Sequence, residues 1–380
     1  MIYKEFKELK LSALGLGAMR LPVVGEGDNT RIDEAKTAEM VACALEQGIN
    51  YFDTAYMYHK GESEIMMGKV LGKYPRDSYY LASKFPGYDP AHFEKIEEIF
   101  EEQLAKCGVE YFDFYLFHNV TESNVDAYTD EKYGLMKYLL KQKEAGRIRH
   151  LGFSTHGTYD TMKRFLDTYG EHLEFCQIEL NYLDWKLQDA KRKVELIREY
   201  HLPIWVMEPL RGGKLASLSE ENTARLAALR PDEGVPAWGF RFLQSIPDVT
   251  MVLSGMSNME QLQDNIATFG EERPLSDAEW EAVMGVAETM MGSLPCTGCR
   301  YCTTYCPNGL DIPAILSLYK DSDMKNSKAT RDAVEALPEG KRPADCVGCR
   351  SCEAVCPQQI RIADIMSYFR GILSQPITEE

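Results

Sequence analysis

Residues 48–58 read GINYFDTAYMY, and this stretch predicts a strand with functional side chains at its end. The apolar run Ile49–Phe52 follows a glycine that closes a helical stretch, and it stops at Asp53. A loop then carries Tyr58. A carboxylate at a strand end and a phenol in the next loop can converge on one pocket only if the strand is held rigidly. The alternative is that Asp53 caps a turn and Tyr58 is an ordinary loop aromatic, so the rest of the chain must distinguish the two.

Strand-like apolar runs recur along the first 290 residues. In chain order they are Ala13–Gly17, Ile49–Phe52, Tyr79–Ser83, Phe112–Phe117, Ile148–Phe153, Phe175–Ile178, Pro203–Met207 and Val249–Leu253. Amphipathic stretches of helical length separate most of them, for example Asp33–Gln47 and His92–Lys106, and glycines such as Gly48 and Gly108 follow these stretches. Strands alternating with helices in this way over about 250 residues predict an α/β fold, the (β/α)8 TIM barrel. A doubly wound sheet is the alternative, but the segment Gly15–Arg20 lacks the third glycine of the dinucleotide fingerprint.

Composition excludes several classes of protein. The chain of 380 residues is 44% hydrophobic and 27% charged, which is typical of globular proteins. Its net charge of −17 argues against nucleic acid or a membrane surface as a partner. The N-terminal residues show no apolar signal region, and no later run is long enough to span a membrane. We therefore expect a cytoplasmic protein with reduced cysteines.

The last quarter of the chain contains one cysteine motif twice. Residues 296–307 read CTGCRYCTTYCP, and residues 346–357 read CVGCRSCEAVCP. Both follow the bacterial ferredoxin run C-x2-C-x2-C-x3-C-P, in which the fourth cysteine binds the other cluster. The motifs predict two 4Fe–4S clusters, one held by Cys296, Cys299, Cys302 and Cys356, and one by Cys346, Cys349, Cys352 and Cys306. Structural zinc is the alternative, but zinc sites use separated pairs of cysteines.

All eight of these cysteines lie beyond the last predicted barrel helix, so two domains are expected. We place the barrel over residues 1–293 and a small, mainly helical, ferredoxin-like iron–sulfur domain over residues 294–380. Two helical stretches, Ile312–Tyr319 and Ser327–Leu337, lie between the motifs.

Four polar residues follow neighbouring barrel strands, at the end where barrel enzymes carry their chemistry. Asp53 and Tyr58 follow the second strand, Lys84 the third and His118 the fourth. A lysine ammonium stabilises a phenolate and lowers the tyrosine pKa, at about 1.4 kcal/mol per pKa unit. Asp53 can act as the counter-ion of Lys84, and His118 can donate a hydrogen bond to a substrate carbonyl. The set suits proton delivery to a carbonyl oxygen while hydride arrives at the carbon.

The chain from about Leu9 to Met291 resembles the aldo-keto reductase family. The matching residues are 14–17 (LGLG), 50–55 (NYFDTA) with Tyr58, 61–64 (GESE), 83–84 (SK), 117–118 (FH) and 152–154 (GFS). The resemblance implies that NAD(P)H binds across the barrel mouth without a Rossmann fold. It also implies that Tyr58 is the acid in carbonyl reduction, assisted by Lys84, Asp53 and His118. Iron–sulfur domains of the kind predicted here occur fused behind such barrels.

The same resemblance implies the residues that bind the nicotinamide cofactor. They are Gly17, Ser154, Thr155, Gln177, Met207, Pro209, Leu210, Gly255, Gln261 and Asn265. Ser154 and Gln177 would hold the carboxamide, and Asn265 would contact the adenine. Some positions depart from the family pattern, because Thr155 replaces the usual asparagine and Met207 replaces an aromatic residue that stacks on the nicotinamide.

Gly255 and Gln261 stand where lysine and arginine often bind the 2′-phosphate of NADPH, and losing two cations weakens that recognition. The family resemblance nevertheless implies NADPH as the first expectation, with NADH close behind. The loop Arg211–Lys214 is either a pyrophosphate cradle or a glycine turn with solvated charges.

The resulting expectation is an NAD(P)H-dependent oxidoreductase that interconverts a small carbonyl and an alcohol. Its clusters would exchange electrons with a redox partner such as a ferredoxin or flavodoxin, or would hold the C-terminal domain folded. The alternative is an electron-transfer or redox-sensing subunit whose barrel binds a nicotinamide or flavin without carbonyl reductase turnover. A nicotinamide moves two electrons and a cluster moves one, so a flavin in the barrel would connect the two halves.

Overall fold

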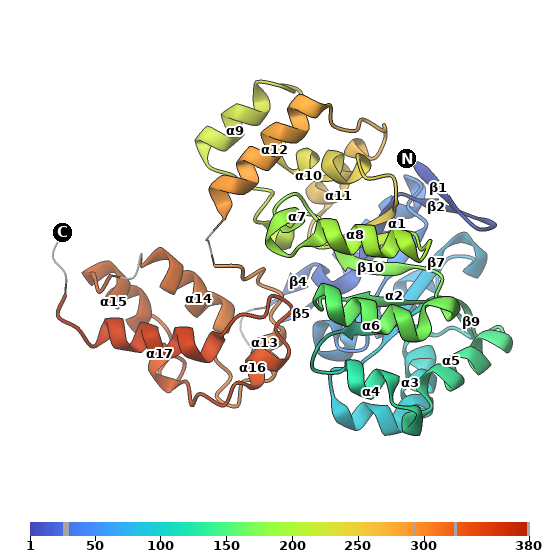
Figure 1. Cartoon of the computed structure of the whole chain (residues 1–380), viewed down its shortest axis with the longest axis horizontal. Helices are drawn as coiled ribbons and strands as arrows, with labels where there is room; N and C mark the ends of the chain where they lie inside the picture. Colours follow the sequence, from blue (N-terminus) through green and yellow to red (C-terminus); the bar gives the residue numbers. More distant parts are fainter. Residues whose placement is uncertain (26–29, 292–293, 323–324, 378–380) are drawn as a thin grey trace. The chain divides into compact units, whose positions relative to one another are not determined.

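A computed structural model describes residues 1–25, 30–291, 294–322 and 325–377 (Figure 1). Within these residues, eight parallel strands close into a barrel. They are β3 (Leu14–Gly17), β6 (Tyr51–Asp53), β7 (Tyr80–Phe85), β8 (Phe112–Val120), β9 (Ile148–Thr155), β10 (Cys176–Glu179), β11 (Ile204–Met207) and β12 (Val249–Ser254). Neighbours in the barrel are neighbours in the chain, and β12 pairs with β3 to complete the ring. The predicted (β/α)8 barrel is confirmed.

Helices follow the strands as the amphipathic stretches predicted. The helices between successive strands are α1 (Glu34–Glu46), α2 (Glu62–Leu71), α3 (Ile96–Cys107), α5 (Leu135–Glu144), α6 (Tyr159–Tyr169), α8 (Ala190–Glu199) and α10 (Val235–Gln244), with α11 (Met259–Thr268) after the last strand. Additional helices are α4 (Val125–Thr129), α7 (Asp184–Leu187), α9 (Glu220–Ala227) and α12 (Asp277–Met290). The predicted glycines after α1 and α3 have left-handed backbone, with φ of 90° at Gly48 and 62° at Gly108, which ends each helix.

An N-terminal hairpin packs into the barrel from the N-terminal ends of its strands. Its strands are β1 (Tyr3–Phe6) and β2 (Leu9–Ser12). The Phe6 ring lies 5.1 Å from the ring of Trp205 and 5.7 Å from that of Phe114, measured between centroids. This hairpin and the aromatic strand residues fill the lower barrel with apolar side chains. The polar side chains discussed below lie at the opposite, C-terminal ends of the strands.

The second compact unit comprises Gly212–Lys214 and the chain from Met290 onward. The predicted domain boundary lies between residues 293 and 294, directly after residues 292–293, which are outside the described part of the chain. The unit is mainly helical, with α13 (Tyr301–Thr304), α14 (Ile312–Asp321), α15 (Lys328–Glu335), α16 (Ser351–Ala354) and α17 (Ile362–Leu373). Among the described residues of either unit, no helix has the length and apolarity needed to cross a bilayer.

The two cysteine runs fold alike. Each places a left-handed arginine before a short helix, with φ of 66° at Arg300 before α13 and 61° at Arg350 before α16. A longer helix follows each run, α14 in one case and α17 in the other. Apolar residues of these two helices, including Ile312, Ile362 and Phe369, form the core of the unit. The sequence repeat is therefore also a structural repeat.

Candidate active site and cysteine-lined cavities

The four polar residues predicted at the barrel mouth lie close together. Lys84 Nζ donates hydrogen bonds to Asp53 Oδ1 at 2.6 Å and to the Thr54 carbonyl oxygen at 2.8 Å. The same ammonium lies 5.0 Å from the ring centroid of Tyr58. The rings of Tyr58 and His118 meet edge to face with centroids 5.9 Å apart. Strands β7 and β8 extend further than predicted, so Lys84 and His118 lie within the strands rather than after them.

The backbone that follows Tyr58 is strained. His59 and Lys60 have φ of 51° and 59°, in the left-handed region, and they lead into Gly61 at 93°. Each non-glycine residue in this region costs about 1–2 kcal/mol. Such conformations persist where surrounding packing imposes them, and they cluster at functional sites. Here the strained turn presents the Tyr58 ring to Lys84 and His118.

Burial controls the charges of this cluster, because all four side chains are buried. Burial lowers the pKa of the Lys84 ammonium and raises the pKa of the Asp53 carboxyl, and in each case the charge of the partner opposes the shift. Burial, assisted by Lys84 and His156, holds the pKa of His118 well below its ordinary value. His118 is therefore a neutral imidazole at physiological pH.

Two polar atoms of the cluster are left for a ligand. Within the described part of the chain, Asp53 Oδ2 and His118 Nδ1 are buried and have no hydrogen-bond partner. A buried polar atom without a partner costs about 1–3 kcal/mol, so it is found where a water or ligand completes the site. The Tyr88 ring, from the loop after β7, packs on His118 with centroids 5.5 Å apart and forms a further wall. An aromatic in a loop has no local signal, and the sequence prediction missed it.

A buried carboxylate holds the strand that carries Lys84. Glu64 Oε1 accepts hydrogen bonds from Ser83 Oγ at 2.5 Å and from Gln103 Nε2 at 2.6 Å. Gln103 also donates to the Lys84 carbonyl oxygen at 3.0 Å and accepts from the Tyr115 hydroxyl at 2.6 Å. Glu64, Ser83 and Gln103 are fully buried. The network therefore fixes β7 from its outer face, opposite the Lys84 side chain.

Two replacements of Glu64 should separate its role as a hydrogen-bond acceptor from its charge. Because burial raises the pKa of Glu64, a neutral amide is a close substitute, and Glu64→Gln should leave the free energy of unfolding nearly unchanged. Glu64→Leu leaves Ser83 and Gln103 without their acceptor and should cost about 1–3 kcal/mol. Denaturant unfolding of the barrel measures both. Equal losses in the two variants would contradict the acceptor role.

The residues predicted to bind the nicotinamide cofactor occupy the other side of the rim. Most lie at or just after the C-terminal ends of β3, β9, β10, β11 and β12, and Gln261 and Asn265 lie in α11, which follows β12. The cluster of Asp53, Tyr58, Lys84 and His118 belongs to β6 and the turn after it, β7 and β8. Gln177 is buried, and among described residues its Oε1 has no hydrogen-bond partner. Gly17 is the last residue of β3, and Met207, the last of β11, is half-buried. Pro209 and Leu210 follow in the loop after β11.

Several of these predicted side chains have internal hydrogen bonds. Thr155 Oγ1 donates to the Val120 carbonyl oxygen at 2.6 Å and accepts from Gly157 N at 2.9 Å, so its hydroxyl is engaged by the backbone. Ser154 Oγ accepts from Asn119 N at 2.9 Å and still has a proton to donate.

The loop after β12 is held in the same way. Asn265 Nδ2 donates to Ser254 Oγ at 3.0 Å, and Gln261 Oε1 accepts from Ser257 N at 2.8 Å. Gly255 is exposed, and a Cβ there would lie 3.2 Å from the side chain of Arg20. The methylene groups of Arg20, which follows β3, thus pack beside Gly255, and its guanidinium lies 3.9 Å from Glu208 Oε1.

The loop Arg211–Lys214 uses its cations internally, so it matches neither predicted alternative in full. Arg211 is fully buried, and its Nε lies 2.9 Å from Asp184 Oδ2. Lys214 Nζ donates to the Leu294 carbonyl oxygen at 2.5 Å. The charges of Arg211 and Lys214 are therefore engaged by other protein groups, whereas a glycine turn with solvated charges would leave both in water.

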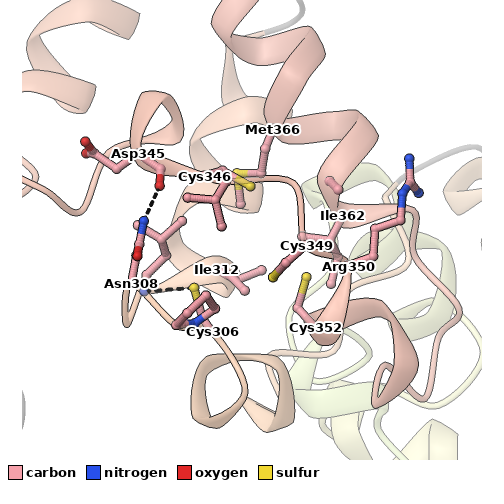
Figure 2. A pocket seen from close by; sticks show the side chains of 14 residues that line it. Cys306, Asn308, Ile312, Asp345, Cys346, Cys349, Arg350, Cys352, Ile362 and Met366 are labelled. Carbon is pink, nitrogen blue, oxygen red and sulfur yellow. Dashed lines mark hydrogen bonds between the residues drawn. The ribbon is translucent and has the colours of Figure 1, made fainter.

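The eight clustered cysteines line two cavities, one for each predicted ligand set. Cys296, Cys299, Cys302 and Cys356 line one cavity. Cys306, Cys346, Cys349 and Cys352 line the other, where the labelled cysteines surround a common space (Figure 2). Each cavity therefore takes three cysteines from one motif and the fourth from the other.

The cysteine spacing within each motif is the one that 4Fe–4S clusters use, whereas zinc sites use separated pairs of cysteines. Across the described ranges, no three His, Cys, Asp or Glu side chains converge as ligands of one metal ion would. Zinc draws its thiolates to one point at about 2.3 Å, whereas a cluster binds each thiolate through the cluster body and needs a larger space. Cys306 Sγ also accepts a hydrogen bond from Leu310 N at 3.4 Å, a contact that tunes cluster potential.

Comparison with known proteins agrees with this geometry. Residues 13–288 match the family described as "Aldo/keto reductase family", and residues 295–360 match "4Fe-4S dicluster domain". The chain is 28% identical to "Probable aldo-keto reductase 1" of Glycine max over 54% of this chain and 57% of that protein. It is 23% identical to the "NADH-specific methylglyoxal reductase" of Escherichia coli (strain K12), over 74% of this chain and 97% of that protein.

A solved structure agrees at the level of the fold. The "aldo-keto reductase AKR11C1 from Bacillus halodurans (holo form)" aligns with a TM-score of 0.61 and 24% identity, over 75% of this chain and 96% of that one. The matched barrel and the matched cluster domain confirm the resemblance found in the sequence. The chain therefore belongs to the aldo/keto reductase family, as an oxidoreductase whose barrel is followed by an iron–sulfur domain.

Proposed function

We propose that this protein reduces a small carbonyl compound to an alcohol, and catalyses the reverse reaction, with Tyr58 as the general acid and base. The observation that carries the proposal is the buried cluster in which Lys84 contacts both Asp53 and the face of Tyr58. A structural ion pair alone would not explain the strained turn at His59 and Lys60 or the open hydrogen-bonding atoms.

Each residue of the cluster has its own role in delivering a proton to the carbonyl oxygen. The neutral His118 imidazole orients the substrate carbonyl, and the Tyr58 hydroxyl gives its proton to the carbonyl oxygen. The Lys84 ammonium stabilises the negative charge that then develops on the phenol oxygen. Asp53 and the Thr54 carbonyl hold Lys84 in place, with Lys84 Nζ 2.6 Å and 2.8 Å from their respective oxygens. A bound NAD(P)H supplies the hydride that reaches the carbonyl carbon.

The same assignment predicts how the reaction depends on pH. Because burial holds the pKa of His118 well below its ordinary value, its imidazole stays neutral over the pH range in which an ordinary histidine titrates, around pH 6.5. His118→Gln should lower kcat/KM by about 10²-fold, and by the same factor across that range. The measurement is kcat/KM against pH for the wild type and for His118→Gln, and the two profiles should be parallel. A ratio that changes near pH 6.5 would show that His118 titrates at its ordinary pKa and would contradict the neutral donor.

For the cofactor we propose NADPH, with NADH as the close competitor. Gln177 supports a nicotinamide carboxamide, because its buried Oε1 has no partner within the described chain and suits an amide donor. Ser154 supports the same contact through its remaining proton. Arg20 beside Gly255 supplies a cation near the loop expected to meet the 2′-phosphate, which favours NADPH. Dissociation constants for the two cofactors, with Arg20→Ala affecting NADPH more than NADH, test this choice.

We propose two 4Fe–4S clusters in the domain of residues 294–380, behind a barrel of residues 1–293. The ligand sets are those of the two cavities, so each cluster takes its fourth thiolate from the other motif. Intact protein should contain about eight iron atoms per chain.

Substitution of single cysteines tests the exchange of ligands between the motifs. Cys356→Ser should leave the same residual cluster spectrum as Cys299→Ser, and Cys306→Ser the same as Cys349→Ser. Electron paramagnetic resonance of the reduced variants is the measurement. If Cys306→Ser instead matches Cys299→Ser, each motif binds its own cluster alone.

The test of the main proposal is turnover by cluster-loaded protein with NADPH or NADH and a panel of aldehydes, ketones and 2-oxoaldehydes. The last class is included because one relative is named as a methylglyoxal reductase. Turnover that depends on Tyr58 supports the proposal, and its absence across the panel overturns it.

A second candidate is an electron-transfer or redox-sensing subunit whose barrel binds a cofactor without carbonyl turnover. It is favoured by the engaged hydroxyl of Thr155 and the engaged amide of Asn265, both expected to face the cofactor. Tight nicotinamide or flavin binding without turnover, together with fast cluster reduction by a ferredoxin or flavodoxin, would support it.

A further inference from the structure

The two cysteine loops share a sequence motif but differ in their exposure. Val347, between Cys346 and Cys349, is 65% exposed and is the most exposed large apolar side chain of the described residues. Its counterpart in the other loop, Thr297, is 5% exposed. A Cβ on Gly212 would lie 2.0 Å from the Thr297 carbonyl oxygen, so the backbone at Gly212, which belongs to the same unit, lies directly against that loop.

The cysteines follow the same pattern. Cys349 is exposed, whereas Cys299, at the equivalent position, is only partly so. Figure 2 shows Cys349 and Cys352 directed toward the cavity, while the Arg350 guanidinium points away from it. One of the two cysteine cavities therefore has a ligand loop at the surface, with an apolar side chain projecting from it.

Basic side chains flank the exposed loop. The Arg350 and Arg361 side chains are 49% and 78% exposed. The carboxylates that pair with them are less exposed, at 19% for Glu353 and 39% for Asp364. The guanidinium groups therefore form the outer part of these ion pairs and face an approaching molecule first.

The net charge is distributed unevenly between the barrel and the cluster unit. From Met290 onward, acidic and basic residues are nearly equal in number, so almost all of the net charge of −17 comes from the preceding chain. An acidic protein would be repelled by the barrel surface and would meet the least repulsion at the cluster unit.

We infer that the loop Cys346–Arg350, together with Arg361, is the docking surface for an acidic one-electron carrier protein of the flavodoxin or ferredoxin class. The carrier passes one electron to the cluster of Cys306, Cys346, Cys349 and Cys352, so the carrier is oxidised and the cluster reduced by one electron each, with no atom transferred. The inference rests on the two-cluster assignment proposed above, and it is independent of carbonyl turnover.

The chemistry of the surface suits this occupant. Val347 offers a small apolar contact beside a cluster ligand, which shortens the path that the electron crosses. The arginines supply charge steering, which raises association rates at low salt and weakens with ionic strength. Electron-transfer encounters are small, below about 1,200 Å² of buried surface, and the loop with Arg361 forms the centre of such a contact.

Charge reversal at Arg361 tests the surface against two matched controls. Arg361→Glu is compared with Arg370→Glu, an exposed arginine further along the same helix, and with Arg300→Glu, which flanks the covered cysteine loop. The probe is a flavodoxin: its oxidised form for equilibrium binding to the cluster-loaded protein, and its reduced form for the rate of cluster bleaching. Iron content and cluster absorbance confirm that each variant is loaded.

We expect Arg361→Glu to weaken binding and to slow bleaching about tenfold at low salt, with the difference lost at about 0.5 M salt. Val347→Asp should slow bleaching at both salt concentrations, because it replaces the apolar contact. The two control variants should change neither quantity by more than about twofold. Equal behaviour of Arg361→Glu and Arg370→Glu, or the larger loss in Arg300→Glu, would overturn the inference. NADPH-dependent carbonyl turnover, measured in parallel, should be the same in all four variants, so failure of the proposed barrel activity is recognised separately.

Discussion

Tyr58→Phe should lower kcat for carbonyl reduction by about 10²–10⁴-fold, with little change in cofactor affinity or stability. The substitution removes only the hydroxyl, and the ring that contacts Lys84 and His118 remains. Without that hydroxyl, the His118 hydrogen bond remains but no acid transfers a proton to the carbonyl oxygen as negative charge develops on it. Steady-state kinetics with saturating NADPH, together with the dissociation constant of NADPH, measure both parts of the expectation.

Tyr56 provides a matched control for that substitution. It lies two residues earlier in the same loop, and its hydroxyl donates to Glu102 Oε2 at 2.9 Å, away from the Lys84 and Asp53 pair. Burial and the hydrogen bond to Glu102 raise the pKa of Tyr56 to about 12, so this phenol is not poised to release a proton. Tyr56→Phe should leave kcat within a few-fold of wild type. A loss in Tyr56→Phe as large as that in Tyr58→Phe would mean that the loop, and not the Tyr58 proton, limits the reaction.

Lys84→Met should give the largest loss of stability, about 3–5 kcal/mol in the free energy of unfolding of the barrel. The methionine leaves Asp53 as an unpaired carboxylate, 3% exposed, which the interior cannot solvate. Adding Asp53→Asn removes that charge and should recover most of the loss. All four tryptophans lie in the barrel unit, so tryptophan fluorescence during denaturant unfolding reports this unit and not the cluster domain.

The control for this prediction is an ion pair of the same length at the surface. Lys69 Nζ lies 2.6 Å from Glu34 Oε2, as Lys84 Nζ lies 2.6 Å from Asp53 Oδ1, but the side chains of the surface pair are 55% and 46% exposed. Water screens that pair, so Lys69→Met should cost less than about 1 kcal/mol. If Lys84→Met costs no more than Lys69→Met, then Lys84 and Asp53 are not a charged pair in the folded protein.

The fold was predictable because its signals are local. Alternating apolar runs and amphipathic stretches reflect how each short segment meets the core, and the eight predicted strands correspond to β3 and β6–β12. The strand limits were less accurate. β7 and β8 continue past the predicted ends, because pairing with neighbouring strands extends a ladder beyond the apolar run.

The sequence by itself determined the barrel, the two cysteine motifs and the residue types that gather at the barrel mouth. Each of these is encoded in the spacing of residues within a short segment, and that spacing can be read from the sequence without coordinates. Only the tertiary structure decided which partner each side chain meets: Thr155 with the Val120 carbonyl, Arg211 with Asp184, Arg20 with Gly255. It alone separated two nearly identical cysteine loops into a covered one and an exposed one. Those choices depend on contacts between segments far apart in the chain, and packing, not local spacing, sets them.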